Sequence, residues 1–349
     1  MPEEHMPTQW VHGGTDALGI PAHDFSTNRN ACGPCPATVA ALQTANSAQY
    51  PDPSYLAVRE ALAQFHGVSA RRVLVAGSAS EFIHRITMHA VRQGAQGVTF
   101  PRHHYGDYAQ AAQVWGLQHA QRSLQAAGEG LHWACAPSSP LGQDEDVAML
   151  WSQQPPEGAW RVLDCAYAPL RMKSFTPPLF ADSVWQMWTP NKALGMTGVR
   201  AAYVIAPVSV DAQEMHALRL LAPSWVVGAH GVAMLQSWVS DEVQQWLQLS
   251  VLQLQEWKTQ QLQLCERLGW QVQVGSQANY FVARWPVQLQ AAMPQLLQVL
   301  RAQGIKLRDC TSFGLQGCVR MGVLAPASQQ ALEQAWQALS LDVVIKDKQ

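Results

Sequence analysis

The clearest sign of chemical activity in this chain is Lys192, together with the residue types around it. Lys192 lies three positions after a hydroxyl residue, Thr189, and eight before Arg200, among small and apolar residues. Apolar surroundings and a nearby cation lower the pKa of a lysine amine and make it a better nucleophile toward an aldehyde. The hydroxyl and the guanidinium suit a phosphate. This spacing predicts a pyridoxal phosphate site in which Lys192 forms the Schiff base, although a surface lysine and arginine on a loop would fit the stretch taken alone.

A second group of residues supplies what the ring of this cofactor needs. Residues 161–164 have the pattern of a short buried strand that ends in Asp164, and Tyr167 follows three positions later. Pyridoxal phosphate acts as an electron sink only while its ring nitrogen is protonated, so a carboxylate must lie beside that nitrogen. We expect Asp164 in that place and Tyr167 on the ring hydroxyl. An aspartate that simply ends a strand in a turn is the alternative.

A third stretch could hold the phosphate. Residues 73–76 are apolar, residues 77–80 are small, and apolar residues then recur at helical spacing. A helix that begins here offers free backbone amides and the positive end of its dipole to an anion. We therefore expect Ala79 and Ser80 at a phosphate. An ordinary serine cap with Glu81 in the first turn is the alternative.

From Asp24 to Val323 the chain resembles the fold type I pyridoxal-phosphate enzymes. Within them it is similar to the branch that holds histidinol-phosphate aminotransferase and the threonine-phosphate decarboxylase of cobalamin biosynthesis. Beyond the three stretches above, the resemblance rests on residues 12–14, 24–30, 50–53, 307–315 and 319–323. All five of these segments resemble the decarboxylase in particular.

The resemblance implies a role for each matching position near the cofactor. Lys192, Asp164 and Tyr167 would be the catalytic residues. The residues that would bind the cofactor are Ala79, Ser80, Tyr105, Ser139, Asp164, Tyr167, Thr189, Lys192, Arg200 and Tyr50. Tyr105 would stack on the ring. Tyr50 would reach the phosphate bound by the neighbouring subunit, which implies a homodimer with shared active sites.

The resemblance also implies residues that bind the substrate, a small phosphorylated amino acid. Arg308 and Arg320 would bind its carboxylate or phosphate, because a guanidinium can hold either anion with two hydrogen bonds. Asn30 and His12 would complete this group. One position departs from the family: Ser139 stands where most relatives carry an asparagine beside the ring oxygen. A serine hydroxyl is shorter but can still donate, directly or through water.

The alternation of helical and strand patterns predicts an α/β fold. The family layout implies a large domain with a mixed, mostly parallel sheet sandwiched by helices, and a smaller α/β domain. The expected large domain covers residues 41–239, and the small domain covers residues 1–40 with 240–349. Helices are expected over 55–65, 108–115, 242–268, 289–303 and 327–339, and strands over 97–100, 161–164, 201–205, 270–274 and 280–284.

Composition agrees with a large cytoplasmic enzyme. The chain has 349 residues, 48% hydrophobic residues and a formal net charge of −2, so no basic excess attracts nucleic acid. The uncharged stretch 220–240 is interrupted by Pro, Gly and His, so we expect a buried helix and no membrane span. Seven cysteines favour a reducing compartment. The pair Cys32 and Cys35 resembles a redox motif, but its flanking residues do not, and no metal site is expected.

The most favoured activity is decarboxylation of L-threonine O-phosphate, or a closely similar phosphorylated amino acid, to an aminopropanol phosphate. The first alternative is an aminotransferase of the histidinol-phosphate or aromatic amino acid type, which would use the same cofactor residues. The second alternative is a pyridoxal phosphate-binding protein without catalysis, which the departure at Ser139 keeps open.

Overall fold

The computed structural model describes residues 13–119, 129–144, 151, 158–172 and 181–346. By packing, the chain forms two units. The larger unit comprises Arg29–Glu256 and Val274–Asn279, and the smaller unit comprises Met1–Asn28, Trp257–Gln273 and Tyr280–Gln349. Residues 29–40 and 240–256 thus pack with the larger unit. The domain boundaries expected from the family layout stay a prediction.

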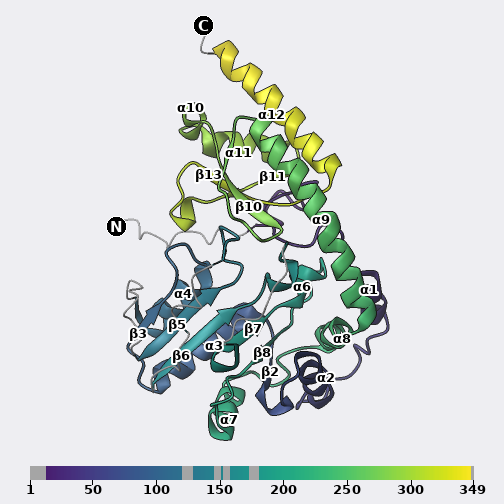
Figure 1. The fold of residues 1–349 in the computed structure, drawn as a ribbon, viewed down its shortest axis with the longest axis vertical. Helices are drawn as coiled ribbons and strands as arrows, with labels where there is room; N and C mark the ends of the chain where they lie inside the picture. Colours follow the sequence, from purple (N-terminus) through teal and green to yellow (C-terminus); the bar gives the residue numbers. More distant parts are fainter. Residues whose placement is uncertain (1–12, 120–128, 145–150, 152–157, 173–180, 347–349) are drawn as a thin grey trace, which may run out of the picture. The chain divides into compact units, whose positions relative to one another are not determined.

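A seven-stranded sheet organises the larger unit (Figure 1). Its order is β2-β8-β7-β6-β5-β3-β4, and β8 alone runs against its neighbours. The strands are β2 (Val73–Ala76), β3 (Gly97–Thr99), β4 (Gln118–His119), β5 (Gly130–Cys135), β6 (Ala159–Asp164), β7 (Trp185–Trp188) and β8 (Ala202–Ile205). The predicted mixed, mostly parallel sheet is confirmed.

Each helix of the larger unit has buried residues. They are α1 (Pro36–Gln43), α2 (Leu56–His66), α3 (Ala79–Arg92), α4 (Gly106–Trp115), α6 (Pro190–Ala193), α7 (Ala212–Leu220), α8 (Ala229–Trp238) and α9 (Asp241–Arg267), whose last residues belong to the smaller unit. Helices α3, α4 and α7 cover one face of the sheet. Phe82, Ile86 and Ala90 of α3 are fully buried there. Each large apolar side chain so buried stabilises the fold by about 1.5–3 kcal/mol.

A four-stranded antiparallel sheet organises the smaller unit, in the order β12-β13-β10-β9. Three tryptophans, Trp270, Trp285 and Trp336, pack together there with ring centroids 4.6–5.3 Å apart. The elements are β1 (His23–Asp24), β9 (Gln271–Val272), β10 (Tyr280–Arg284), α10 (Val287–Gln290), α11 (Met293–Ala302), β11 (Ile305–Lys306), β12 (Arg308–Asp309), β13 (Cys318–Gly322) and α12 (Pro326–Lys346). Strands β1 and β11 pair in parallel.

Two sequence expectations differ from the structure. The helix expected over 289–303 is two helices, α10 and α11, because Pro294 can enter a helix only in its first turn and so starts α11. The uncharged stretch 220–240 forms only one helix of ten residues, α8, which begins after Gly228. Its buried residues include Met234, Leu235 and Trp238.

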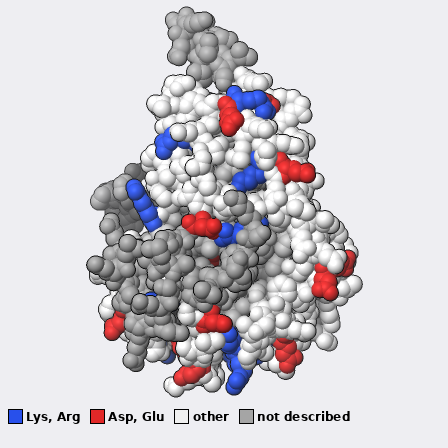
Figure 2. All heavy atoms as spheres, in the orientation of Figure 1, with Lys and Arg blue, Asp and Glu red and all other residues white. Residues whose placement is uncertain are grey.

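The charged side chains of the described residues are sparse and mixed. On the face in Figure 2 they lie singly or near residues of opposite sign, without an extended patch of one sign. Among the described helices, none combines the length and apolar character needed to cross a membrane.

Candidate active site

The direction of the strands gathers the expected cofactor residues at one edge of the larger sheet. Strands β2, β3, β5, β6 and β7 run in the same direction, so their carboxyl ends meet there. Because β8 is antiparallel, its beginning lies at the same edge. Asp164 is the last residue of β6, and Arg200 precedes β8. The expected residues that follow the five strands are Ala79, Ser80, Tyr105, Ser139, Tyr167, Thr189 and Lys192. Ligands of α/β sheets commonly bind at such an edge.

Lys192 lies on the short helix α6, directly after β7. Its Nζ donates a hydrogen bond of 3.4 Å to Oγ1 of Thr189, the residue that precedes the helix. The same Nζ lies 5.2 Å from the centre of the Tyr167 ring. The structure therefore brings together three of the residues that the sequence singled out.

Asp164 ends β6 as a fully enclosed carboxyl group. Its Oδ1 accepts a hydrogen bond of 2.8 Å from the backbone N–H of Ala166. Its Oδ2 accepts one of 2.6 Å from the hydroxyl of Tyr108. Burial raises the pKa of Asp164, while the Tyr108 hydrogen bond and the positive charge of Lys192 act in the opposite direction. A cationic group beside this carboxyl would compensate for its burial.

Sequence reasoning missed Tyr108. It lies in the first turn of α4, and its ring stacks on that of Trp133 from β5, with centroids 4.4 Å apart. The spacing of three residues from Tyr105 was the available signal, because residues i and i+3 share one side of a helix. The two tyrosine rings meet edge to face at 5.8 Å.

The start of α3 combines a helix cap with the expected phosphate position. The Ser78 side chain caps the helix by accepting from the backbone N–H of Glu81, as the alternative interpretation of this stretch expected. Glu81 in turn accepts from the N–H of Gly77 and pairs with Arg85. Ser80 and Tyr105 approach each other, with hydroxyl oxygens 3.4 Å apart. The cap and the phosphate role are compatible, because the cap occupies only some of the free amides.

The remaining expected cofactor residues differ in burial. Ser139 is buried just after β5, next to the strand that carries Asp164. Arg200 is exposed. Tyr50 is 77% exposed, and its ring stacks on Trp225 at 4.4 Å. Their cofactor roles stay predictions.

The two expected substrate arginines lie side by side in the smaller unit. Arg308 of β12 is the register partner of Arg320 of β13, and both are buried. The ring of Phe313 lies 4.8 Å from the Arg308 guanidinium and 5.7 Å from that of Arg320. Burial, and next the charge of Arg320, lower the pKa of Arg308. Two desolvated like charges at one place favour an anion between them.

The other two expected substrate residues lie elsewhere. Asn30 is fully buried in the larger unit, and its side chain binds the backbone of α6, the helix that carries Lys192. His12 lies outside the described residues.

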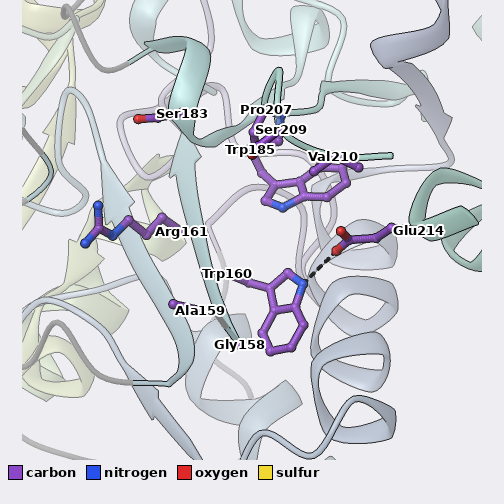
Figure 3. Close-up of a pocket in the computed structure, with 10 residues that line it drawn as sticks. All are labelled: Gly158, Ala159, Trp160, Arg161, Ser183, Trp185, Pro207, Ser209, Val210 and Glu214. Atoms are coloured by element: carbon purple, nitrogen blue, oxygen red, sulfur yellow. Dashed lines mark hydrogen bonds between the residues drawn. The ribbon is translucent and has the colours of Figure 1, made fainter. Parts of the chain in front are cut away.

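A cavity of about 360 Å³ lies at the opposite edge of the larger sheet (Figure 3). It is lined by the beginnings of β6 and β7, the loop after β8 and the first turn of α7. Inside it Trp160 donates a hydrogen bond of 2.8 Å to Glu214, while Arg161 points away from that carboxylate (Figure 3). Because β6 and β7 begin here and end near Lys192, this cavity is separate from the candidate active site.

The fold and the residues at its edge define a fold type I pyridoxal-phosphate enzyme. Residues 21–339 match the model of the aminotransferase class I and II family, and the chain belongs to this family. It is 25% identical to histidinol-phosphate aminotransferase 1 of Archaeoglobus fulgidus, over 86% of this chain and 94% of that protein.

Two solved structures illustrate the likeness of fold. One is histidinol-phosphate aminotransferase from Sinorhizobium meliloti in complex with pyridoxal-5'-phosphate, with a TM-score of 0.74 and 20% identity over 90% of each chain. The other is L-threonine-O-3-phosphate decarboxylase from Porphyromonas gingivalis, with a TM-score of 0.69 and 20% identity over 87% of this chain and 93% of that chain.

The residues at the sheet edge fit the family's cofactor, pyridoxal phosphate. Lys192 would supply an amine, the buried Asp164 would supply a carboxyl group for the ring nitrogen, and the start of α3 would supply free amides for the phosphate. The three groups come from adjacent or nearby strands that end at the same edge.

Proposed function

We propose that the protein decarboxylates L-threonine O-phosphate, or a closely similar phosphorylated amino acid, to an aminopropanol phosphate and carbon dioxide. The observation that carries this proposal is the buried pair Arg308 and Arg320. L-threonine O-phosphate has two anionic groups, a carboxylate and a phosphate, and each can take one guanidinium. Histidinol phosphate has only its phosphate. The pair therefore supports a substrate with two anions.

Several residues of the chain hold the cofactor and set its protonation. When bound, pyridoxal phosphate supplies an electron sink for the electron pair released as a bond at the substrate's α carbon breaks. Asp164 holds a proton on the cofactor's ring nitrogen. Tyr105 presents a flat aromatic face, and Thr189, Ser80 and Arg200 bind phosphate oxygens.

Lys192 is the proposed acid at the α carbon. As carbon dioxide leaves, the α carbon needs one proton to complete the product, and the amine of Lys192 delivers it. A lysine suits this step because its protonated amine can act as a general acid. Thr189, at 3.4 Å, steadies the amine by accepting one of its hydrogen bonds.

Transamination of histidinol phosphate or an aromatic amino acid is the second candidate. It is supported by the names of curated relatives, of which the Archaeoglobus protein is one. The same lysine would then remove a proton from the α carbon, and an amino acceptor would be required. An aminotransferase also handles an acidic partner such as glutamate, for which two arginines would be equally useful.

One experiment separates the two activities. Purified protein loaded with pyridoxal phosphate is incubated with L-threonine O-phosphate, and separately with histidinol phosphate and 2-oxoglutarate. Carbon dioxide without an acceptor supports decarboxylation, whereas glutamate supports transamination. Arg308→Met and Arg320→Met should each raise the KM for L-threonine O-phosphate, because each removes one cation. If neither variant changes KM, the two-anion argument is wrong.

We also propose a homodimer in which Tyr50 of one subunit serves the site of the other. Its 77% exposure supports this, because a residue that completes a neighbour's site must project from its own subunit. Sedimentation measures the oligomeric state. Mixing inactive Lys192→Ala with Tyr50→Ala subunits should restore activity in the hybrids, since one of their two sites is then intact. No recovery in verified hybrids would contradict shared sites.

A further inference from the structure

Two segments far apart in the sequence are joined through their backbones beside Lys192. The backbone N–H of Asn30 donates to the carbonyl oxygen of Lys192 at 2.8 Å. The side-chain Nδ2 of Asn30 donates to the carbonyl of Ala193 at 2.9 Å. The N–H of Cys35 donates to the carbonyl of Leu194 at 2.9 Å. Three successive carbonyls at the end of α6 therefore bind one segment, residues 30–35, which we call the clamp segment.

Close packing accompanies these hydrogen bonds. A Cβ atom on Gly33 would lie 2.7 Å from the carbonyl oxygen of Leu194. A Cβ on Gly195 would lie 2.9 Å from the Cα of Gly33, and Gly195 has a φ of +70°, which a side chain would strain. The two backbones can approach so closely only because a glycine stands on each side.

Asn30, the first residue of the clamp segment, makes two side-chain hydrogen bonds. Its side chain is fully buried and uses both ends: Nδ2 binds Ala193, and Oδ1 accepts from the N–H of Cys32 at 2.9 Å. The second bond holds the clamp segment in its own turn, and the first attaches that turn to α6. A buried amide with both ends bound has one orientation, because any rotation would leave polar groups unpaired.

The helix that carries Lys192 needs outside support. It has only four residues, and so short a helix is unstable alone. The carbonyls of its first three residues bind N–H groups of the turn that follows, whereas the carbonyl of Ala193 binds the side chain of Asn30. We propose that Asn30 is a positioning residue, which fixes the backbone of α6 so that the amine of Lys192 stays near Thr189 and Tyr167. This inference rests on the assignment of Lys192 as the cofactor's lysine, and it differs from the substrate contact that the family resemblance implied for Asn30.

The test compares two cofactor forms. Pyridoxal phosphate can bond covalently to Lys192, whereas pyridoxamine phosphate has an amine in place of the aldehyde and cannot. Losing the buried bond to Ala193 in Asn30→Ala should weaken pyridoxal phosphate binding by about tenfold. Binding of pyridoxamine phosphate should stay within about twofold. The visible absorbance of bound pyridoxal phosphate should also titrate at a different pH, because the position of the lysine has changed.

A matched control comes from the same chain. Asn46 also accepts a hydrogen bond from the N–H two residues ahead, that of Ala48, but it is exposed. Asn46→Ala should leave both affinities unchanged. Asn30→Asp keeps the size and the bond to Cys32 but sets a carboxylate oxygen against the carbonyl oxygen of Ala193, so it should weaken pyridoxal phosphate binding at least as much as Asn30→Ala. Gly33→Ala disturbs the same contact from the backbone side, and Gly228→Ala, whose Cβ meets nothing within 4 Å, is its control.

Three outcomes would overturn the inference. Unchanged affinity and absorbance in Asn30→Ala would show that the clamp segment does not position Lys192. An equal loss for both cofactor forms would indicate general damage to the site. A raised KM with normal cofactor binding would indicate a substrate contact. The two cofactor affinities and the absorbance titration do not depend on which reaction the enzyme performs, and Lys192→Ala tests the lysine assignment separately.

Discussion

The hydroxyl of Tyr108 donates a hydrogen bond of 2.6 Å to Oδ2 of Asp164, inside the larger unit. The tyrosine belongs to α4 and the aspartate to the end of β6, so this bond ties the covering helix to the sheet edge. Stacking on Trp133 fixes the tyrosine ring. The orientation of Asp164 is therefore set before any cofactor binds.

Tyr108→Phe should reduce catalysis most strongly at low pH. The hydrogen bond lowers the pKa of Asp164, so its loss lets burial raise that pKa further. The carboxyl must be ionised to hold a proton on the ring nitrogen, and the acid limb of the kcat/KM profile should move to higher pH. At neutral pH kcat/KM should fall roughly tenfold, as for one hydrogen bond to a charged group. Tyr203→Phe is the control, because that buried hydroxyl contacts His66 and Trp238 instead.

Asp164→Asn should stabilise the cofactor-free protein while it removes turnover. Burial raises the pKa of Asp164 in the folded state, so an ionised carboxyl costs stability at every pH above its ordinary pKa in the unfolded chain. Below that pKa both states are protonated and the cost disappears. Thermal unfolding of the cofactor-free variant should therefore show a higher Tm at pH 7 and no difference near pH 3. A lower Tm at pH 7 would contradict this account.

Lys192→Ala should abolish turnover and the covalent pyridoxal phosphate that borohydride fixes to the protein, because no other amine is expected at this edge. The informative control is Lys258 of α9, because burial lowers its pKa to about 8 and makes it the chemically competing amine. Lys258→Met should keep the adduct on the peptide that contains Lys192. Mass spectrometry of the borohydride-reduced and digested protein shows, for each variant, which peptide carries the adduct.

Ser139→Asn should tighten pyridoxal phosphate binding about fivefold, as for one neutral hydrogen bond of on the order of 1 kcal/mol. The prediction assumes that the amide reaches the ring oxygen that relatives bind with asparagine. Ser139 is buried after β5, so the larger side chain must fit an enclosed place. Weaker binding in a cofactor titration would mean that the pocket has been reshaped around serine.

Local sequence patterns predicted much of the larger unit. Apolar residues mark the strand that ends in Asp164 and the strand before Ser78, and Ser78 caps the helix that follows. Such signals involve residues only a few positions apart, so the sequence shows them directly. The resemblance to a family added the order of the elements. The break between α10 and α11 was missed, although Pro294 marks it, because the apolar spacing continues through it.

Contacts between distant segments could not be predicted from the sequence. Tyr108 and Asp164 are 56 positions apart, and Asn30 and Ala193 are 163 apart. No spacing rule relates such positions, and only the packed sheet and its helices bring them together. The register that sets Arg308 opposite Arg320 is likewise a property of the paired strands β12 and β13.

The reversed direction of β8 limits where this protein tolerates insertions. Residues 194–201 connect the lysine turn to β8, and both ends of this connection are held, one by the clamp segment and the other by pairing with β7 and β2. An added residue there must bulge out of the loop or shift β8 by one position. Such a shift would turn Tyr203 to the opposite face of the sheet. We therefore expect natural and engineered length variation to avoid this loop.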